Sequence, residues 1–177
     1  MKWLRTILKW CLGIFLCAWV GQYLLALVIP NLVMEILYQR GGVETDYNAL
    51  FVNPRPDETM RKVVRPSPDL LYASCIFNLE QGPVVIESPV PERYWSMQFY
   101  QMNTDNFAGI TNQRDQDERI GTVVEVTLIG PDRNPGDYSG EVIQSPTQRG
   151  IMLLRASGIG DDTSARAALE KSSCRPA

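Results

Sequence analysis

The feature that most constrains this chain is an uncharged apolar run near its N-terminus. Residues 10–29 read W-C-L-G-I-F-L-C-A-W-V-G-Q-Y-L-L-A-L-V-I, and Gln22 is the only strongly polar side chain among them. A helix of this length rises roughly 30 Å, which matches the hydrocarbon core of a bilayer. The rest of the chain is too small to surround such a helix with protein. The run therefore predicts a transmembrane segment, with membrane lipid around residues 10–29.

The residues that flank this run predict its orientation and its fate. Lys2, Arg5 and Lys9 precede it, and the first acidic residue is Glu35. Basic residues stay on the cytoplasmic side of a membrane, so we expect a cytoplasmic N-terminus. The alternative is a cleaved signal peptide, which has a shorter apolar core of about 7–15 residues and a small-residue cleavage site. The ending A-L-V-I-P offers no such site. We therefore expect residues 1–30 to be an uncleaved single-pass anchor.

A second, shorter helix is expected after the anchor. Pro30 predicts the end of the span, and residues 31–43 then favour an amphipathic helix beside the membrane. Asn31 is the expected N-cap and Gly41 the expected residue after the last turn. One face of this helix is apolar and carries Leu32, Val33, Ile36 and Leu37. That face could lie on the membrane surface or pack on the following domain, and packing is the favoured interpretation.

Residues 44–177 predict a β-rich domain. Leu71, Ala73 and Cys75 begin an alternating pattern that is typical of a strand with one buried face. Expected strands cover residues 71–79, 84–88, 95–100, 122–129, 141–144 and 151–156. Asp161 or Asp162 can begin a final helix that runs to about Lys171. The predicted fold class is mainly β: an antiparallel sheet or sandwich with an N-terminal transmembrane helix and short flanking helices.

Composition excludes several kinds of function. The chain has no histidine, so a Ser-His-Asp or Cys-His mechanism within it is excluded. Its four cysteines form no C-x-x-C pair, so we expect no metal and no cofactor. Beyond the anchor, 14 of the 17 basic residues stand against 20 acidic ones, a net charge of −6. An acidic domain of this kind argues against nucleic acid as a partner.

Several short segments, in a fixed order, together resemble one bacterial family. They are R-P-S-P-D-L-L-Y-A-S-C (65–75), L-E-Q-G-P-V-V-I (79–86), R-Y-W-S-M-Q (93–98), N-T-D-N-F (103–107), I-G-P (129–131) and S-P-T (145–147), with Arg155 downstream. The resemblance is to domain of unknown function 1254, a family without an established activity. In longer relatives a second β-rich domain follows, domain of unknown function 1214. The resemblance implies a bacterial inner-membrane protein with a periplasmic domain. It also implies a separate anchored partner that carries the companion domain.

Four candidate ligand-binding residues lie where two expected strands begin. Asp69 and Tyr72 open the strand of residues 71–79, and Asp69 after Pro68 is typical of a turn. Arg93 and Tyr94 precede the strand of residues 95–100. Arg93 could hold a carboxylate ligand, or it could form a structural ion pair with Asp105 or Asp69. Each residue therefore has a structural and a functional interpretation.

Three further candidates lie at other strand positions. Asp105 and Asn106 follow the strand of residues 95–100, where an edge turn is the default and a sugar or cation contact the alternative. Arg155 interrupts an apolar strand, so it either faces solvent or has a carboxylate partner. Two cysteines, Cys75 and Cys174, could form a disulfide in an exported domain, although Cys75 could equally be a small buried side chain.

These observations support three functional hypotheses. The first is a subunit of an envelope complex with the companion-domain protein. The second is a module that binds an envelope glycan or a small ligand at the polar rim around Asp69, Arg93, Asp105 and Asn106. The third is a hydrolase that uses a carboxylate pair such as Asp69 and Asp105. The first hypothesis is favoured. The third is the weakest, because every acidic domain offers carboxylate pairs.

Overall fold

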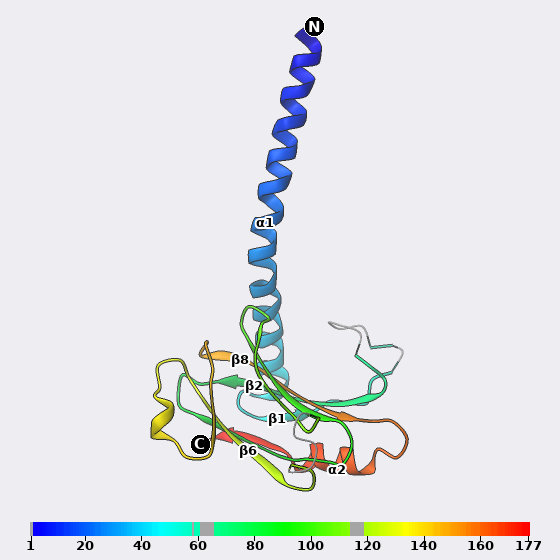
Figure 1. Cartoon of the computed structure of the whole chain (residues 1–177), viewed down its shortest axis with the longest axis vertical. Coiled ribbons are helices and arrows are strands. Elements are labelled where there is room, and N and C mark those ends of the chain that lie inside the picture. The colour runs from blue at the N-terminus through cyan, green and yellow to red at the C-terminus, as the bar shows by residue number, and fades with distance from the viewer. Residues whose placement is uncertain (1, 58, 61–65, 114–118) are drawn as a thin grey trace.

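The computed structural model describes residues 2–57, 59–60, 66–113 and 119–177 (Figure 1). A long helix, α1 (Lys2–Thr45), leads into a sandwich of two β-sheets. The five-stranded sheet has the order β1 (Leu50–Val52), β2 (Leu70–Asn78), β8 (Arg149–Ser157), β4 (Trp95–Gln101) and β5 (Asn106–Thr111). The four-stranded sheet has the order β7 (Glu141–Gln144), β6 (Val123–Ile129), β3 (Val84–Pro89) and β9 (Ser173–Pro176). A short 3-10 helix, η1 (Pro135–Asp137), and a helix, α2 (Thr163–Lys171), complete the fold. The predicted fold class is confirmed.

All pairings in the five-stranded sheet are antiparallel, and β6–β7 in the other sheet is parallel. The sequence analysis did not predict β1, β5 and β9. β1 has three residues, too few to show an alternating pattern, and β9 (S-C-R-P) has a single buried residue and a proline. All three lie at the edges of their sheets, where one neighbouring strand decides whether a strand forms.

The core lies between the two sheets and is held by apolar side chains with one polar connection. Trp95, Phe77 and Phe99 are its largest fully buried side chains. The Trp95 indole Nε1 donates a hydrogen bond to Ser88 Oγ across the sandwich, at 3.1 Å. Ser172 Oγ also contacts Ser88 Oγ, at 2.9 Å. The buried Ser88 hydroxyl therefore satisfies the one polar atom of a buried tryptophan.

A disulfide also joins the two sheets. Cys75 in β2 and Cys174 in β9 are bonded, and their Cα atoms lie 6.4 Å apart. The two residues are 99 positions apart in the chain. The sequence left this pairing open, because Cys75 fits a buried strand position whether or not it is bonded.

Helix α1 differs from the expectation, because it does not end at Pro30. Asn31 is not an N-cap: its side-chain Nδ2 donates to the Leu27 carbonyl, at 2.9 Å. Proline removes one backbone donor and disfavours the preceding turn, but apolar helices tolerate it when neighbouring groups satisfy the freed positions. The helix continues to Thr45, and Asp46 with a φ of 63° ends it in the left-handed region.

Gly41 was expected just beyond the helix, and the structure places it inside the last turns. A Cβ on Gly41 would lie 2.9 Å from Cδ1 of Ile76 in β2. The glycine therefore allows the helix to approach the sheet closely, and the interpretation as a terminating residue was wrong.

The helix also packs on the domain through a different face from the one predicted. The buried residues of α1 are Met34, Tyr38 and Gly42, spaced by four. The Tyr38 ring stacks on Tyr47, with ring centroids 5.0 Å apart. The predicted apolar face does not make the contact, because Leu32, Val33 and Ile36 are exposed. The contact between α1 and the domain is therefore a narrow stripe of one residue per turn. The apolar side chains of Leu32, Val33 and Ile36 beside this stripe remain exposed.

Candidate functional site

The outer face of the five-stranded sheet brings together three of the predicted site residues. Register pairs Tyr72 of β2 with Arg155 of β8, and Arg155 with Ser96 of β4. Their neighbours Ala73 and Leu154 are fully buried in the core. Because side chains alternate along a strand, Tyr72, Arg155 and Ser96 form one row on the outer face. Tyr94 joins this row, since its hydroxyl lies 2.9 Å from Ser96 Oγ.

Helix α1 leaves from the same face. Figure 1 shows α1 on the side of β2 and β8, with β6 and α2 on the opposite side of the sandwich. The contact of Gly41 with Ile76 fixes this arrangement, because Ile76 is an outward residue of β2. Arg149, also outward on β8, lies over the Tyr38 ring at 5.2 Å and pairs with Glu35 at 3.5 Å.

Arg155 has an unusual environment within this row. Its Nε is shielded from solvent and has no hydrogen-bond partner in the described part of the chain. The carboxylate that the sequence predicted for a buried Arg155 is absent among the described residues, where no ion pair includes it. A charged donor without an acceptor is costly to shield from water. An outside acceptor at this position would therefore be favourable.

The two sheets also differ in charge. None of the five strands in the sheet below α1 contains Asp or Glu, and their two charged residues are Arg149 and Arg155. The four-stranded sheet carries Glu87, Glu125, Glu141 and Arg175. Among strand residues, acidic side chains thus occur only in the four-stranded sheet, and the charged side chains in the strands around Arg155 are all positive.

For Arg93 the sequence left open a carboxylate ligand and a structural ion pair with Asp105 or Asp69, and among the described residues neither ion pair is formed. The Arg93 guanidinium Nη1 donates to the Ile159 carbonyl in the connection between β8 and α2. It also lies close enough to Asp161 to favour the charged carboxylate. Hydrogen bonds from the Thr163 hydroxyl and amide contribute more, and together these groups hold the pKa of Asp161 below its usual value. Arg93 therefore holds the connection between β8 and α2 in place.

Asp105 lies in the turn between β4 and β5, and Asn106 is the first residue of β5. Asp105 accepts a hydrogen bond from Asn103 Nδ2 at 2.8 Å, and its amide donates to Asn103 Oδ1 at 3.0 Å. Asn106 Nδ2 donates to Gln98 Oε1 at 2.8 Å. These bonds organise a tight turn, in which Thr104 has a φ of 76°. Among the described residues, no group of three or more His, Cys, Asp or Glu could hold a metal ion.

Asp69 and Asp105 lie at opposite ends of the five-stranded sheet. The Asp69 carbonyl accepts from Gly158 at the end of β8, whereas Asp105 follows the end of β4. Both β2 and β4 pair antiparallel with β8, so they run in the same direction. The length of β4 separates the two carboxylates by on the order of 20 Å. Glycoside hydrolysis needs a separation of about 5–9.5 Å, so this pair is not brought together.

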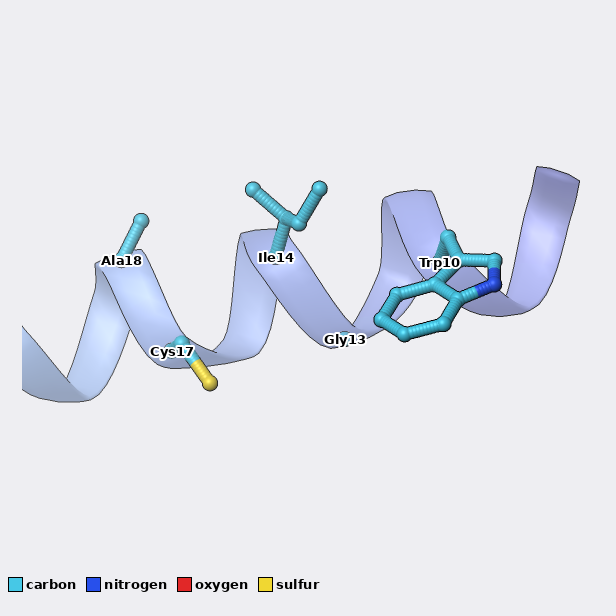
Figure 2. A pocket seen from close by; sticks show the side chains of 5 residues that line it. All are labelled: Trp10, Gly13, Ile14, Cys17 and Ala18. Atoms are coloured by element: carbon cyan, nitrogen blue, oxygen red, sulfur yellow. The ribbon is translucent and has the colours of Figure 1, made fainter.

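Helix α1 carries a shallow apolar hollow (Figure 2). It is lined by Trp10, Gly13, Ile14, Cys17 and Ala18, and Figure 2 shows that Gly13 leaves the space between the Trp10 ring and Cys17. By length and composition α1 can cross a membrane. Small residues on such a helix permit the close approach of another helix. The hollow lacks charged side chains and lies on a single helix, so it does not form a small-ligand site.

The sequence matches the model of one protein family over residues 47–176, described as "Protein of unknown function (DUF1254)". The chain belongs to this family. The resemblance drawn from the short segments is therefore confirmed, and DUF1254 covers the whole sandwich. No curated protein matches the sequence.

Two solved structures resemble the fold. One is the VPA0106 protein from Vibrio parahaemolyticus, with a TM-score of 0.60, 15% identity, and coverage of 83% of this chain and 35% of that one. The other is a putative uncharacterized protein from Burkholderia cenocepacia, with a TM-score of 0.50, 15% identity, and coverage of 73% and 36%. At this identity the likeness shows the fold alone. This chain spans about a third of the length of each structure.

The row around Arg155 was only partly visible in the sequence. Tyr72, Tyr94 and Arg155 were candidates, but Ser96 was missed, because it reads as an ordinary outward position of a strand. Only the register of β4 against β8 places Ser96 beside Arg155.

Proposed function

We propose that this DUF1254 protein is one subunit of an envelope complex, next to a separate anchored protein that carries the companion β-rich domain. In this proposal α1 crosses the bacterial inner membrane once. Lys2, Arg5 and Lys9 keep the N-terminus in the cytoplasm, and the sandwich lies in the periplasm.

One observation carries the proposal: in both similar structures the larger part of the chain lies outside the match. In those proteins the polypeptide extends well beyond the part that matches the sandwich. The proposal is that a second chain takes that place here, as the resemblance to the longer, two-domain relatives suggests. An anchor on each partner would restrict both domains to the membrane surface and raise their effective concentration.

The connection between β3 and β4, residues 90–94, is a suitable contact for the partner. Three exposed apolar side chains lie near it: Ile120, Val123 and Ile159. The Val90 amide donates to the Thr122 carbonyl at 2.9 Å, which brings the turn before β6 to this connection. Arg93 brings Ile159 to it. Exposed apolar side chains that gather at one end of a domain favour contact with another protein.

The test is purification of full-length tagged protein from gently solubilised membranes, with mass spectrometry of the proteins that accompany it. A photo-crosslinking residue at Val123 or Ile159 adds spatial information. Phe51 in β1 is the matched control, because it is exposed and apolar but lies at the far edge of the five-stranded sheet. We expect one stoichiometric partner that has its own anchor and a β-rich domain, crosslinked from Val123 and Ile159 and not from Phe51.

Two results would contradict the proposal. One is a protein that purifies alone from membranes at native expression. The other is equal crosslinking from all three positions, which would indicate chance encounters and no defined surface.

A further inference from the structure

We propose that the row formed by Tyr72, Arg155 and Ser96, together with Tyr94, binds a phosphate group, and that the headgroup of an anionic phospholipid supplies it. This inference goes beyond the proposed assembly, because it needs no partner protein. It assigns a ligand class to the outer face of the five-stranded sheet.

The first argument is the unsatisfied guanidinium. Arg155 Nε is shielded from solvent without an acceptor among the described residues, while the side chain as a whole stays partly exposed. Arginine presents its donors as a planar fork that fits two oxygens of a phosphate. Nε itself is shielded from any outside atom, so two oxygens of a phosphate would meet the guanidinium at its Nη groups, and the phosphate charge would offset that of the unpaired arginine. Structural arginines of this domain, such as Arg175 with Glu87 at 2.7 Å, already have acceptors.

The second argument is the surroundings of that guanidinium. Hydroxyl groups lie on both sides of Arg155. The Tyr72 hydroxyl on β2 accepts a hydrogen bond from the Ser67 amide at 3.0 Å and keeps its own proton to donate. The Tyr94–Ser96 pair lies on β4, and Ser96 in it is buried, so Tyr94 is the hydroxyl there that a ligand can reach. Hydroxyl groups can donate to the remaining oxygens of a phosphate. The five strands contain no carboxylate that would compete for the arginine or repel an anion. Within the strands, acidic side chains occur only in the other sheet, and the acidic residue that the structure places on this face, Glu35 of α1, is paired with Arg149.

The third argument is position. The first buried residue of α1 is Met34, five residues after the expected membrane span ends at Ile29. The helix reaches the sheet at Gly41, beside Ile76 of β2 and twelve residues after Ile29, so the sheet lies about 18 Å of helical rise from the end of the expected span. The face that carries Arg155 is the face from which α1 leaves (Figure 1). Phosphate groups of the membrane are therefore the anions present at highest local concentration.

The test uses full-length protein labelled with ¹⁵N in neutral maltoside micelles. Inorganic phosphate and glycerol 1-phosphate are the soluble probes. Phosphatidylglycerol added to the micelles is the lipid probe, and phosphatidylcholine, which carries no net charge, is its comparison. The readout is the Nε–H resonance of Arg155, identified by its loss in Arg155→Lys. Arg175→Gln is the matched control, since it removes one positive charge from the other sheet.

We expect phosphatidylglycerol to move the Arg155 resonance in a saturable way. Arg155→Gln should weaken binding at least tenfold, and Arg175→Gln should change it less than twofold. Movement with phosphatidylglycerol only supports a lipid source, and movement with soluble phosphate as well supports a phosphate site open to free ligands. A resonance that no probe moves would overturn the inference, even if Arg155→Gln fails to fold, because that result comes from the native protein. Equal losses in Arg155→Gln and Arg175→Gln would also overturn it, since they would show a general effect of charge.

Discussion

At the scale of single residues, Gly150 shows how little room the sandwich leaves. It is the second residue of the central strand β8 and lies beside Phe77. A Cβ there would lie 2.4 Å from the Tyr100 carbonyl oxygen and 2.3 Å from the Phe77 ring. The backbone oxygen cannot move away without disturbing the pairing of β4 with β8. Position 150 therefore requires glycine because a Cβ atom has no room there, although the backbone conformation of Gly150 is one that other residues can adopt.

The first prediction concerns Gly150→Ala. Because both the ring and the backbone would have to shift, we expect a loss of about 3 kcal/mol in the free energy of unfolding. Urea denaturation of the full-length protein in micelles measures it. Gly136→Ala in η1 is the control, since its Cβ would make an ordinary contact of 3.5 Å with Asn134. A Gly150→Ala protein as stable as the Gly136→Ala protein would contradict the close packing of β8.

The second prediction concerns Ser88, the buried acceptor of the Trp95 indole. Ser88→Ala leaves Trp95 Nε1 buried without an acceptor, so we expect a loss of about 1–3 kcal/mol in unfolding free energy. Ser172→Ala is the matched comparison, because it removes the other hydroxyl of the cluster and leaves the Trp95 bond intact. Denaturation followed by tryptophan fluorescence compares the two. A loss for Ser172→Ala as large as that for Ser88→Ala would argue against this role of Ser88.

Residue chemistry also set the limit of prediction from the sequence. The sequence showed that Arg155 in an apolar strand needs a partner or solvent, and it marked Tyr72 and Tyr94 as candidates. It did not show that these residues share a row, because a shift of one residue in register reverses the face of every side chain. The possible ion pair of Arg93 with Asp105 or Asp69 is not formed, because the Arg93 guanidinium donates to the Ile159 carbonyl. Asp105 lies at the opposite end of the sheet from Arg93, whereas Asp69 lies at the same end, and the sequence did not show this difference.

At the scale of elements, α1 decides how the domain sits relative to the apolar span. A break at Pro30 would join two helices at a variable angle. A continuous helix instead connects the apolar span rigidly to the domain. Met34 and Tyr38, both buried, hold the C-terminal part of this helix against the domain. Proline removes one backbone hydrogen bond, as the sequence analysis assumed, but the predicted end of the helix at Pro30 was wrong. The Asn31 side chain and the contact with β2 both favour the continued helix.

The third prediction tests this continuity. Spin labels at Val20 and Gln39, both exposed on α1, should give a narrow distance distribution centred near the rise of 19 helical residues, about 28 Å. Cys11 and Cys17 are replaced by serine so that only the labelled sites react. Double electron–electron resonance spectroscopy of the protein in micelles measures the distance between the two labels. Pro30→Ala should shift the centre by no more than a few ångströms, and a broad distribution that narrows only in Pro30→Ala would support the broken helix.

At the scale of the whole molecule, the long strands and the fold class could be predicted because each long strand carries its own alternation. β1 and β9 could not: β1 has three residues, β9 has one buried residue and a proline, and each pairs with one neighbouring strand in its sheet. The dependence of β9 on a single neighbouring strand also explains the role of the disulfide. β9 is an edge strand of four residues near the C-terminus, and the bond from Cys174 to Cys75 ties it to the other sheet.

The last prediction joins this bond to the orientation of the chain. Loss of a bridge that closes a segment of 99 residues should lower the unfolding free energy by about 2–5 kcal/mol in Cys75→Ala/Cys174→Ala, and Cys11→Ser/Cys17→Ser should change it little. The bond persists only in an oxidising compartment, so a periplasmic domain should keep both cysteines protected from alkylation in intact cells until a reductant is added. Mass spectrometry of protein trapped with a maleimide before lysis measures this protection. Alkylation of Cys75 and Cys174 without reductant would place the domain in a reducing compartment, and the proposed envelope complex would then lose its location.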